Sequence, residues 1–223
     1  MLKWFKENII EPIKEGVEEA KAELAVEKAE KEKLEEEFEA TFETISQEEK
    51  LALALAAPFR CVATGQYVSL FDIDEEEAQQ KPPCLYQIGN LAEQDKKILD
   101  ELASLLKRDF KATDQQTTLE AIQTFKNALF TETIPDTIAF HAAVISYLTT
   151  GAADLGYLTK EEALEEVKEV ADLVRDHYPN WEAYGKDFLA GDYMNNALGK
   201  KILSRVVKNL LVCSGSPWNQ VKL

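Results

Sequence analysis

Apolar residues recur at steps of three or four through the first part of this chain, which is the spacing of one face of an α-helix. The apolar positions of this stripe are Leu2, Phe5, Ile9, Ile13, Val17, Ala20 and Leu24, followed by Leu34, Phe38 and Phe42. Between them, residues 27–33 place Glu and Lys at spacings that pair opposite charges on a helix. The pattern predicts a charged amphipathic helical segment over residues 1–45.

A second series of helical signals predicts a helical domain over residues 46–223. Ser46 with Glu49, and Thr159 with Glu162, have the spacing of a capping box, in which two side chains bond the first turn of a helix. From Leu51 onward, leucine and alanine alternate with the period of a β-strand, but alanine favours a helix. Further helices are expected over 90–107, from Thr117 or Thr118, and over 136–150, 159–177, 180–188 and 193–213. Since no series of strands appears, the predicted class is all-α, an irregular helical bundle.

The helical spacing is lost between Arg60 and Gly89, which predicts a long irregular acidic loop with at most a brief strand at 67–71. Its acidic residues are Asp72, Asp74, Glu75, Glu76 and Glu77. Alternate carboxylates open a calcium-binding loop, but here the sixth position is Glu77 instead of Gly and the twelfth is Pro83 instead of Glu. A solvated loop is the simplest interpretation. A contact for a basic partner, or weak calcium capture, is the functional alternative.

Charge and composition exclude several classes of protein. The 223 residues carry 41 acidic and 25 basic side chains, a formal net charge of -16, so binding to a nucleic-acid backbone is not expected. A hydrophobic content of 45% suffices for a folded core. The longest apolar run, 51–59, is too short to cross a bilayer and contains Pro58. Three widely spaced cysteines argue against a disulfide framework, and a cytoplasmic protein is expected.

No motif in the chain indicates a particular reaction. The glycines form no phosphate-binding motif, and no pair of cysteines has metal-ligand spacing, so neither a cofactor nor a metal is predicted. The carboxylates between Glu161 and Glu169 are interpreted as the solvated face of a helix. An enzyme would therefore have to use an isolated residue in a cleft, for which His141 and Asp154 are the candidates.

Four short motifs occur together in the C-terminal third of the chain. They are Gly156-Tyr157 leading to Glu161-Glu162-Ala163, Asn180-Trp181 leading to Tyr184, Phe188 leading to Gly191, and the ending Ser216-Pro217-Trp218. Their order and spacing resemble an uncharacterised bacterial family of unknown function that includes YbeU-like and YbeR-like proteins. The resemblance covers residues 50–223 and implies architectural roles for Gly156, Tyr157, Trp181, Tyr184, Gly191 and Trp218. It implies no reaction.

These observations lead to one main functional hypothesis and two alternatives. The main hypothesis is an acidic cytoplasmic protein-binding module, of the immunity or inhibitor type, that neutralises a basic toxin or nuclease. Its expected contacts are the acidic run of residues 72–77 and the charged segment 15–39. The alternatives are an adaptor that associates through residues 1–45, with its own copy or another helix, and an enzyme that uses His141 or Asp154.

Overall fold

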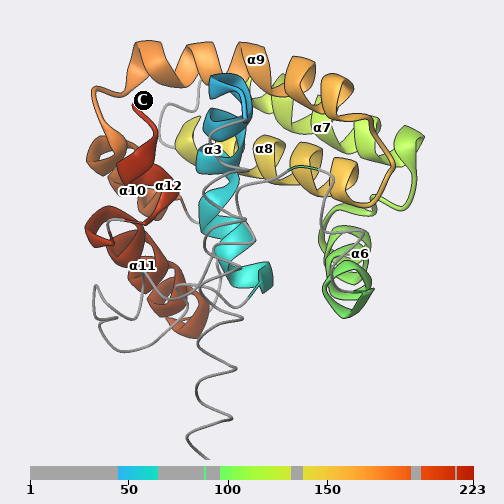
Figure 1. Ribbon diagram of the computed structural model, residues 1–223, viewed down its shortest axis with the longest axis horizontal. Coiled ribbons are helices and arrows are strands. Elements are labelled where there is room, and N and C mark those ends of the chain that lie inside the picture. The colour runs from blue at the N-terminus through green and yellow to red at the C-terminus, as the bar shows by residue number, and fades with distance from the viewer. Residues whose placement is uncertain (1–44, 65–87, 89–95, 132–137, 192–196, 214) are drawn as a thin grey trace, which may run out of the picture. The chain divides into compact units, whose positions relative to one another are not determined.

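The computed structural model describes residues 45–64, 88, 96–131, 138–191, 197–213 and 215–223 (Figure 1). All of them belong to one compact unit, Ile45–Leu223. The described helices are α3 (Gln47–Thr64), α6 (Lys96–Phe110), α7 (Gln115–Thr131), α8 (Ile138–Asp154), α9 (Lys160–His177), α10 (Trp181–Ala190), α11 (Ala197–Val212) and α12 (Pro217–Gln220). The described residues contain no strand, so the predicted all-α class is confirmed. The predicted N-terminal helix, most of the acidic loop and its brief strand lie outside the described residues.

Helix α8 is the centre of the bundle. Its residues from Ala142 to Asp154 are all buried, as expected for a helix that is apolar all round. Helices α3, α6, α7, α9 and α10 pack around it. In α3, the residues from Leu51 to Ala57 are buried on every side, which explains why leucine and alanine alternate there without forming a strand.

The two predicted capping boxes behave differently. At α9 the box is complete, because the Glu162 N–H donates to Thr159 Oγ1 at 3.1 Å and the Thr159 N–H donates to Glu162 Oε2 at 2.7 Å. At α3 the Glu49 N–H donates to Ser46 Oγ at 3.1 Å, as predicted. The buried Glu49 carboxylate, however, accepts from the Ile88 N–H at 3.1 Å and pairs with Lys160 of α9. It therefore joins three separate parts of the chain.

Several helix boundaries differ from those predicted. Helix α7 begins at Gln115, before the predicted start at Thr117 or Thr118, because the Asp114 carboxylate accepts from the Thr117 N–H at 2.8 Å and caps the helix. Helix α3 continues to Thr64, past the predicted end of its helical pattern at Arg60. The short helix α12 was not predicted.

Helix α3 accommodates Pro58 in its interior through hydrogen bonds from distant residues. Proline has no N–H, so the carbonyl of Ala54, four residues earlier, has no donor within the helix. The indole Nε1–H of Trp218 donates to that oxygen at 2.8 Å. The Tyr184 hydroxyl lies at 3.3 Å from the next carbonyl, that of Leu55, and at 3.0 Å from the carbonyl of Ala139. The C-terminal helices are thereby attached to the middle of α3.

Candidate functional site

The residues singled out by the family resemblance occupy structural positions. Gly156 follows α8 with φ of 72°, in the left-handed region that favours glycine. The Gly156 N–H donates to Ala153 O at 3.0 Å and the Tyr157 N–H to Ala152 O at 2.8 Å, which is the Schellman arrangement. Gly191 is buried at the end of α10 with φ of -59°, where no special backbone freedom is required.

The three aromatic residues of that set pack together. The rings of Trp181 and Trp218 are stacked, with centroids 5.3 Å apart and planes at 5°. Tyr184 meets both rings edge-on, at 5.4 and 5.8 Å. The Trp181 indole N–H donates to Val221 O at 2.7 Å. This cluster attaches α10 and α12 to α3.

The two residues considered for catalysis pack against neighbouring helices, and neither is among the described residues that line the groove reported below. Asp154 is buried and forms an ion pair with Arg60 at 2.7 Å, while Arg60 also donates to Thr150 Oγ1 at 3.2 Å. These contacts join α3 to α8. The half-buried His141 ring lies 6.0 Å from Phe125 and 5.6 Å from Phe140. The described residues also contain no group of His, Cys, Asp and Glu arranged to hold a metal ion.

Helix α9 presents an acidic face to solvent. Its inner side is formed by Ala163, Val167, Val170, Ala171 and Val174. Its outer side carries a row of exposed carboxylates, which we call the α9 acidic strip: Glu161, Glu165, Glu169, Asp172 and Asp176. Two further carboxylates on the helix have structural contacts, since Glu162 closes the capping box and Glu166 pairs with Lys126 at 2.6 Å.

Most of the α9 acidic strip takes no part in holding the bundle together. Asp172 lies 3.6 Å from Arg175 on the same helix. Among the described residues, no hydrogen bond or ion pair involves the side chains of Glu161, Glu165, Glu169 or Asp176. Glutamates four residues apart repel each other by about 0.2–0.5 kcal/mol per pair on a helix. The strip is therefore not explained by the stability of its own helix.

The distribution of charge over the described residues supports a functional role for this strip. The described residues contain 17 acidic and 17 basic side chains, so the formal excess of -16 resides entirely in the other parts of the chain. Within the described residues, acidic and basic side chains are enriched in different segments. Helix α9 has seven acidic and three basic residues, whereas residues 197–223 have five basic residues and no acidic one. The acidic surface of the described unit is thus concentrated on α9.

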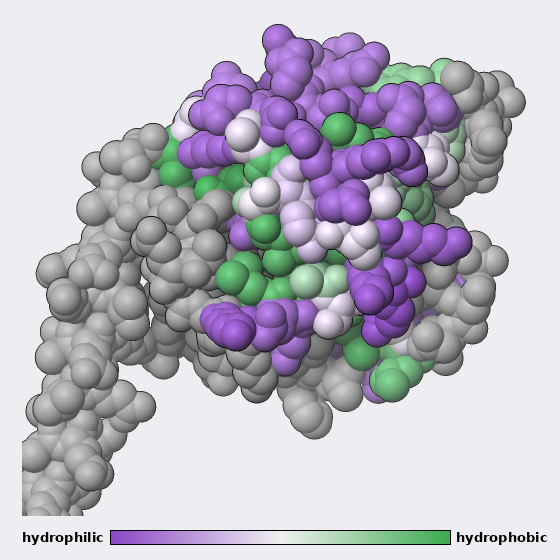
Figure 2. All heavy atoms as spheres, turned by 90° about the vertical axis from the view of Figure 1, so that its right-hand side faces the viewer, coloured by the Kyte–Doolittle hydropathy of each residue, from purple (hydrophilic) through white to green (hydrophobic). Residues whose placement is uncertain are grey.

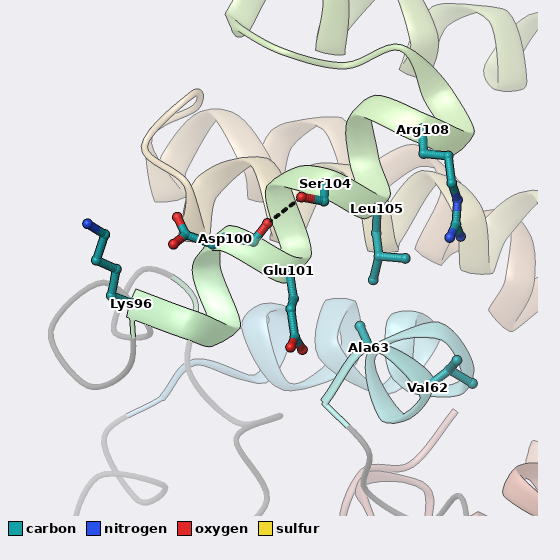
Figure 3. Close-up of a pocket in the computed structure, with 8 residues that line it drawn as sticks. All are labelled: Val62, Ala63, Lys96, Asp100, Glu101, Ser104, Leu105 and Arg108. Carbon is teal, nitrogen blue, oxygen red and sulfur yellow. Dashed lines mark hydrogen bonds between the residues drawn. The ribbon is translucent and has the colours of Figure 1, made fainter.

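A groove lies between the last turns of α3 and the outer face of α6, with a volume of about 880 Å³ (Figure 3). Helix α6 rests on α8 through the buried Leu102 and Leu106, which lie against Gly151. On the α3 side the groove is lined by Val62 and Ala63. On the α6 side it is lined by Lys96, Asp100, Glu101, Ser104, Leu105 and Arg108.

This groove was not predicted from the amino-acid sequence. The polar positions of α6 at 96, 100, 104 and 108 do follow four-residue steps, which is a readable signal. The opposite wall was missed because α3 was expected to end near Arg60, although it continues to Thr64. The predicted partner-binding residues Asp72, Asp74, Glu75, Glu76 and Glu77, and the segment 15–39, lie outside the described residues and stay predictions.

Comparison with models of protein families gives a match over most of the chain. A family model described as "Protein of unknown function (DUF1266)" matches residues 10–223. No curated protein and no solved structure matches. Because the match begins at residue 10, the expected coverage of 50–223 was too short, and most of the charged N-terminal segment lies within the family's region. None of the described helices is long and apolar enough to span a bilayer.

Proposed function

This chain belongs to the DUF1266 family of proteins of unknown function, and we propose that it is a protein-binding module whose partner is a basic protein. The observation that carries the proposal is the α9 acidic strip. Its carboxylates are exposed, repel one another along one side of the helix and contribute little to the packing of the bundle. A surface of this kind attracts a positively charged protein.

Electrostatics also indicates what such a surface does for binding. Complementary charges accelerate encounter and orient the partner, and their effect falls steeply with ionic strength because salt screens exposed charges. The excess of -16 in the rest of the chain adds a field of the same sign. The acidic run of residues 72–77 is a second expected contact, made with the same partner.

A narrower form of the proposal concerns the identity of the partner. We propose a toxin or nuclease, which this chain would keep inactive, because a nucleic-acid-degrading protein needs a basic surface and an acidic protein competes for it. A closer relationship to YbeU-like and YbeR-like proteins within the family is also part of the proposal. It rests on the motifs from Gly156 to Ala163 and from Ser216 to Trp218.

The proposal is tested by capture followed by kinetics. The full chain is used as bait in cytosol from the source organism at low salt, and each retained protein is identified. Association of the purified partner with the full chain is then timed at about 25 and 300 mM NaCl. We expect a basic partner whose association rate falls by about tenfold or more at the higher salt. An association rate that does not change with salt would count against the proposal.

A pair of charge-reversal variants locates the contact. The double variant Glu165→Lys, Glu169→Lys alters the α9 acidic strip at two exposed positions. The control, Glu120→Lys, Glu182→Lys, makes the same change of charge at two exposed positions on α7 and α10. We expect the first variant to associate several-fold more slowly than the control, with both variants folded at the temperature of the assay. Equal association rates would remove α9 from the interface.

A further inference from the structure

We infer that the groove between α3 and α6 is a docking site for an amphipathic helix of the partner protein, held by an apolar floor and an ordered row of charges. This inference deepens the proposed function, because both assume a protein partner. It is carried by a different surface, however, and is tested separately from the α9 acidic strip.

The groove has an apolar floor. Val62, 39% exposed, lies with Ala63 on the last turn of α3, and Leu105 and Glu101 of α6 extend toward this turn (Figure 3). Leu105 is half-buried, so part of its side chain remains available for contact. On the side of the molecule shown in Figure 2, hydrophobic residues are visible below and between hydrophilic ones. Covering apolar area of this kind removes it from water, which favours binding.

The rim of the groove is charged and follows a definite order along α6. Lys96 is followed by Asp100 and Glu101, then by the apolar Leu105, and then by Arg108. With a rise of about 1.5 Å per residue, the two basic ends are about 18 Å apart along the helix axis. A helix of similar length fits alongside if its facing residues are, in order, acidic, basic, apolar and acidic.

The charges of this row are accessible for such pairing. Lys96, Asp100 and Glu101 are exposed and form no ion pair with another described residue. Arg108 donates to its neighbour Asp109 at 2.6 and 2.8 Å, but its side chain is 70% exposed, and exposed ion pairs contribute little to stability. A partner carboxylate can therefore share the guanidinium at little cost.

The chemistry of the groove favours a helix over a small molecule. Sites for small molecules enclose most of the ligand in apolar walls with few polar groups. Here the five polar residues known to line the groove, among those the structure describes, are all exposed, and four of them carry charges of both signs, so a small ligand would remain largely in water. An amphipathic helix uses both features, since its apolar side chains cover the floor while its charged flanks meet the rim.

The probe for this site is a synthetic alanine-rich helix of about 16 residues. Its facing positions, at four-residue steps, carry glutamate, lysine, leucine and glutamate in that order. A control peptide of the same composition exchanges the first glutamate with the lysine, which brings like charges together. Binding to the full chain is measured by fluorescence anisotropy. We expect the ordered peptide to bind at least about fivefold more tightly than the control. Equal affinities, or no binding of either peptide at about 1 mM, would overturn the inference.

Two protein variants test the position of the probe. Val62→Asp places a charge on the apolar floor, and Val212→Asp makes the same change at a 49% exposed valine in the last turn of α11. We expect Val62→Asp to weaken probe binding about tenfold or more and Val212→Asp to leave it within about twofold. An equal loss for both variants would overturn the inference.

A charge exchange distinguishes specific docking from general adhesion. The double variant Asp100→Lys, Glu101→Lys is expected to lose affinity for the ordered peptide and to gain it for a peptide in which glutamate replaces the lysine. A variant that prefers the original peptide would contradict the proposed order of charges. These assays use neither the natural partner nor α9. The docking site can therefore fail its test while the proposed function passes the salt-dependent association assay, and the reverse is also possible.

Discussion

Replacing Trp218 by Phe tests how α3 tolerates a proline in its interior. The substitution keeps an aromatic ring beside Trp181 but removes the indole N–H that donates to Ala54 O at 2.8 Å. Ala54 and Trp218 are 0% and 3% exposed, so water cannot readily take the place of the lost donor. Pro58 has no N–H to offer, and the carbonyl of Ala54 is left without the bond that the native structure gives it.

The expected loss of stability follows from two contributions. Leaving a buried acceptor without a donor costs about 1–3 kcal/mol. The smaller ring leaves a gap beside Gly185, whose added Cβ would lie only 3.1 Å from the indole, and this loss of packing costs about 1 kcal/mol more. The free energy of unfolding should therefore fall by about 2–4 kcal/mol. For a chain of this length, each kcal/mol corresponds to about 2–4 °C in melting temperature.

A double-mutant cycle with Pro58→Ala isolates the hydrogen bond. Alanine at position 58 supplies the N–H that Ala54 O lacks, so Trp218→Phe should cost about 1–2 kcal/mol less in that background. Unfolding by urea is followed by far-UV circular dichroism, because the substitution alters tryptophan fluorescence. If the cost of Trp218→Phe is the same in both backgrounds within about 0.5 kcal/mol, the indole does not replace the missing donor.

Three further predictions concern single residues. Asp154→Asn should lower the free energy of unfolding by about 3–5 kcal/mol in urea, because it removes the counterion of the buried Arg60; a loss below about 1 kcal/mol would show that the pair is not structural. Gly156→Ala should cost about 1–2 kcal/mol through its left-handed backbone alone, whereas Gly215→Ala, which also adds a Cβ into open space, should be nearly neutral in the same thermal melts. Burial raises the pKa of the Cys61 thiol, so the folded chain keeps a proton that the unfolded chain releases. The contribution of the Cys61 thiol to the free energy of unfolding is therefore fully present below about pH 8.5 and is lost as the pH rises further. Cys61→Ala should make the urea midpoint decline less steeply between about pH 8 and 10.

The helices that the sequence predicted correctly are specified by residues close together in the chain. The capping box of Thr159 and Glu162 spans one turn, and each partner is in place as soon as that turn forms. The helical state of the stretch after Leu51 follows from the preference of alanine and leucine for helix. Asn180, which accepts from the Ala183 N–H at 2.9 Å, starts α10 in the same local way.

The roles of several charged residues were predicted wrongly because a distant residue decides them, whereas the start of α7 was misplaced through a local cap, Asp114. The Glu49 carboxylate was assigned to the first turn of its own helix, but it is buried against Ile88 and Lys160, which are 39 and 111 residues away. The pairing of Asp154 with Arg60 likewise spans 94 residues. A single sequence gives no indication of which distant partner a charged side chain will meet.

The amino-acid sequence by itself determined the helical class, most helix starts and the family, because spacing, caps and motifs are local properties of the chain. Only the tertiary structure decided that α3 continues through Pro58, since the donor that replaces the missing N–H, on Trp218, lies 164 residues beyond Ala54 in the chain. The extension of α3 also forms one wall of the groove beside α6. Packing also decided which carboxylates of α9 hold the bundle together and which face solvent, because burial depends on what lies opposite each side chain and not on its neighbours in the chain.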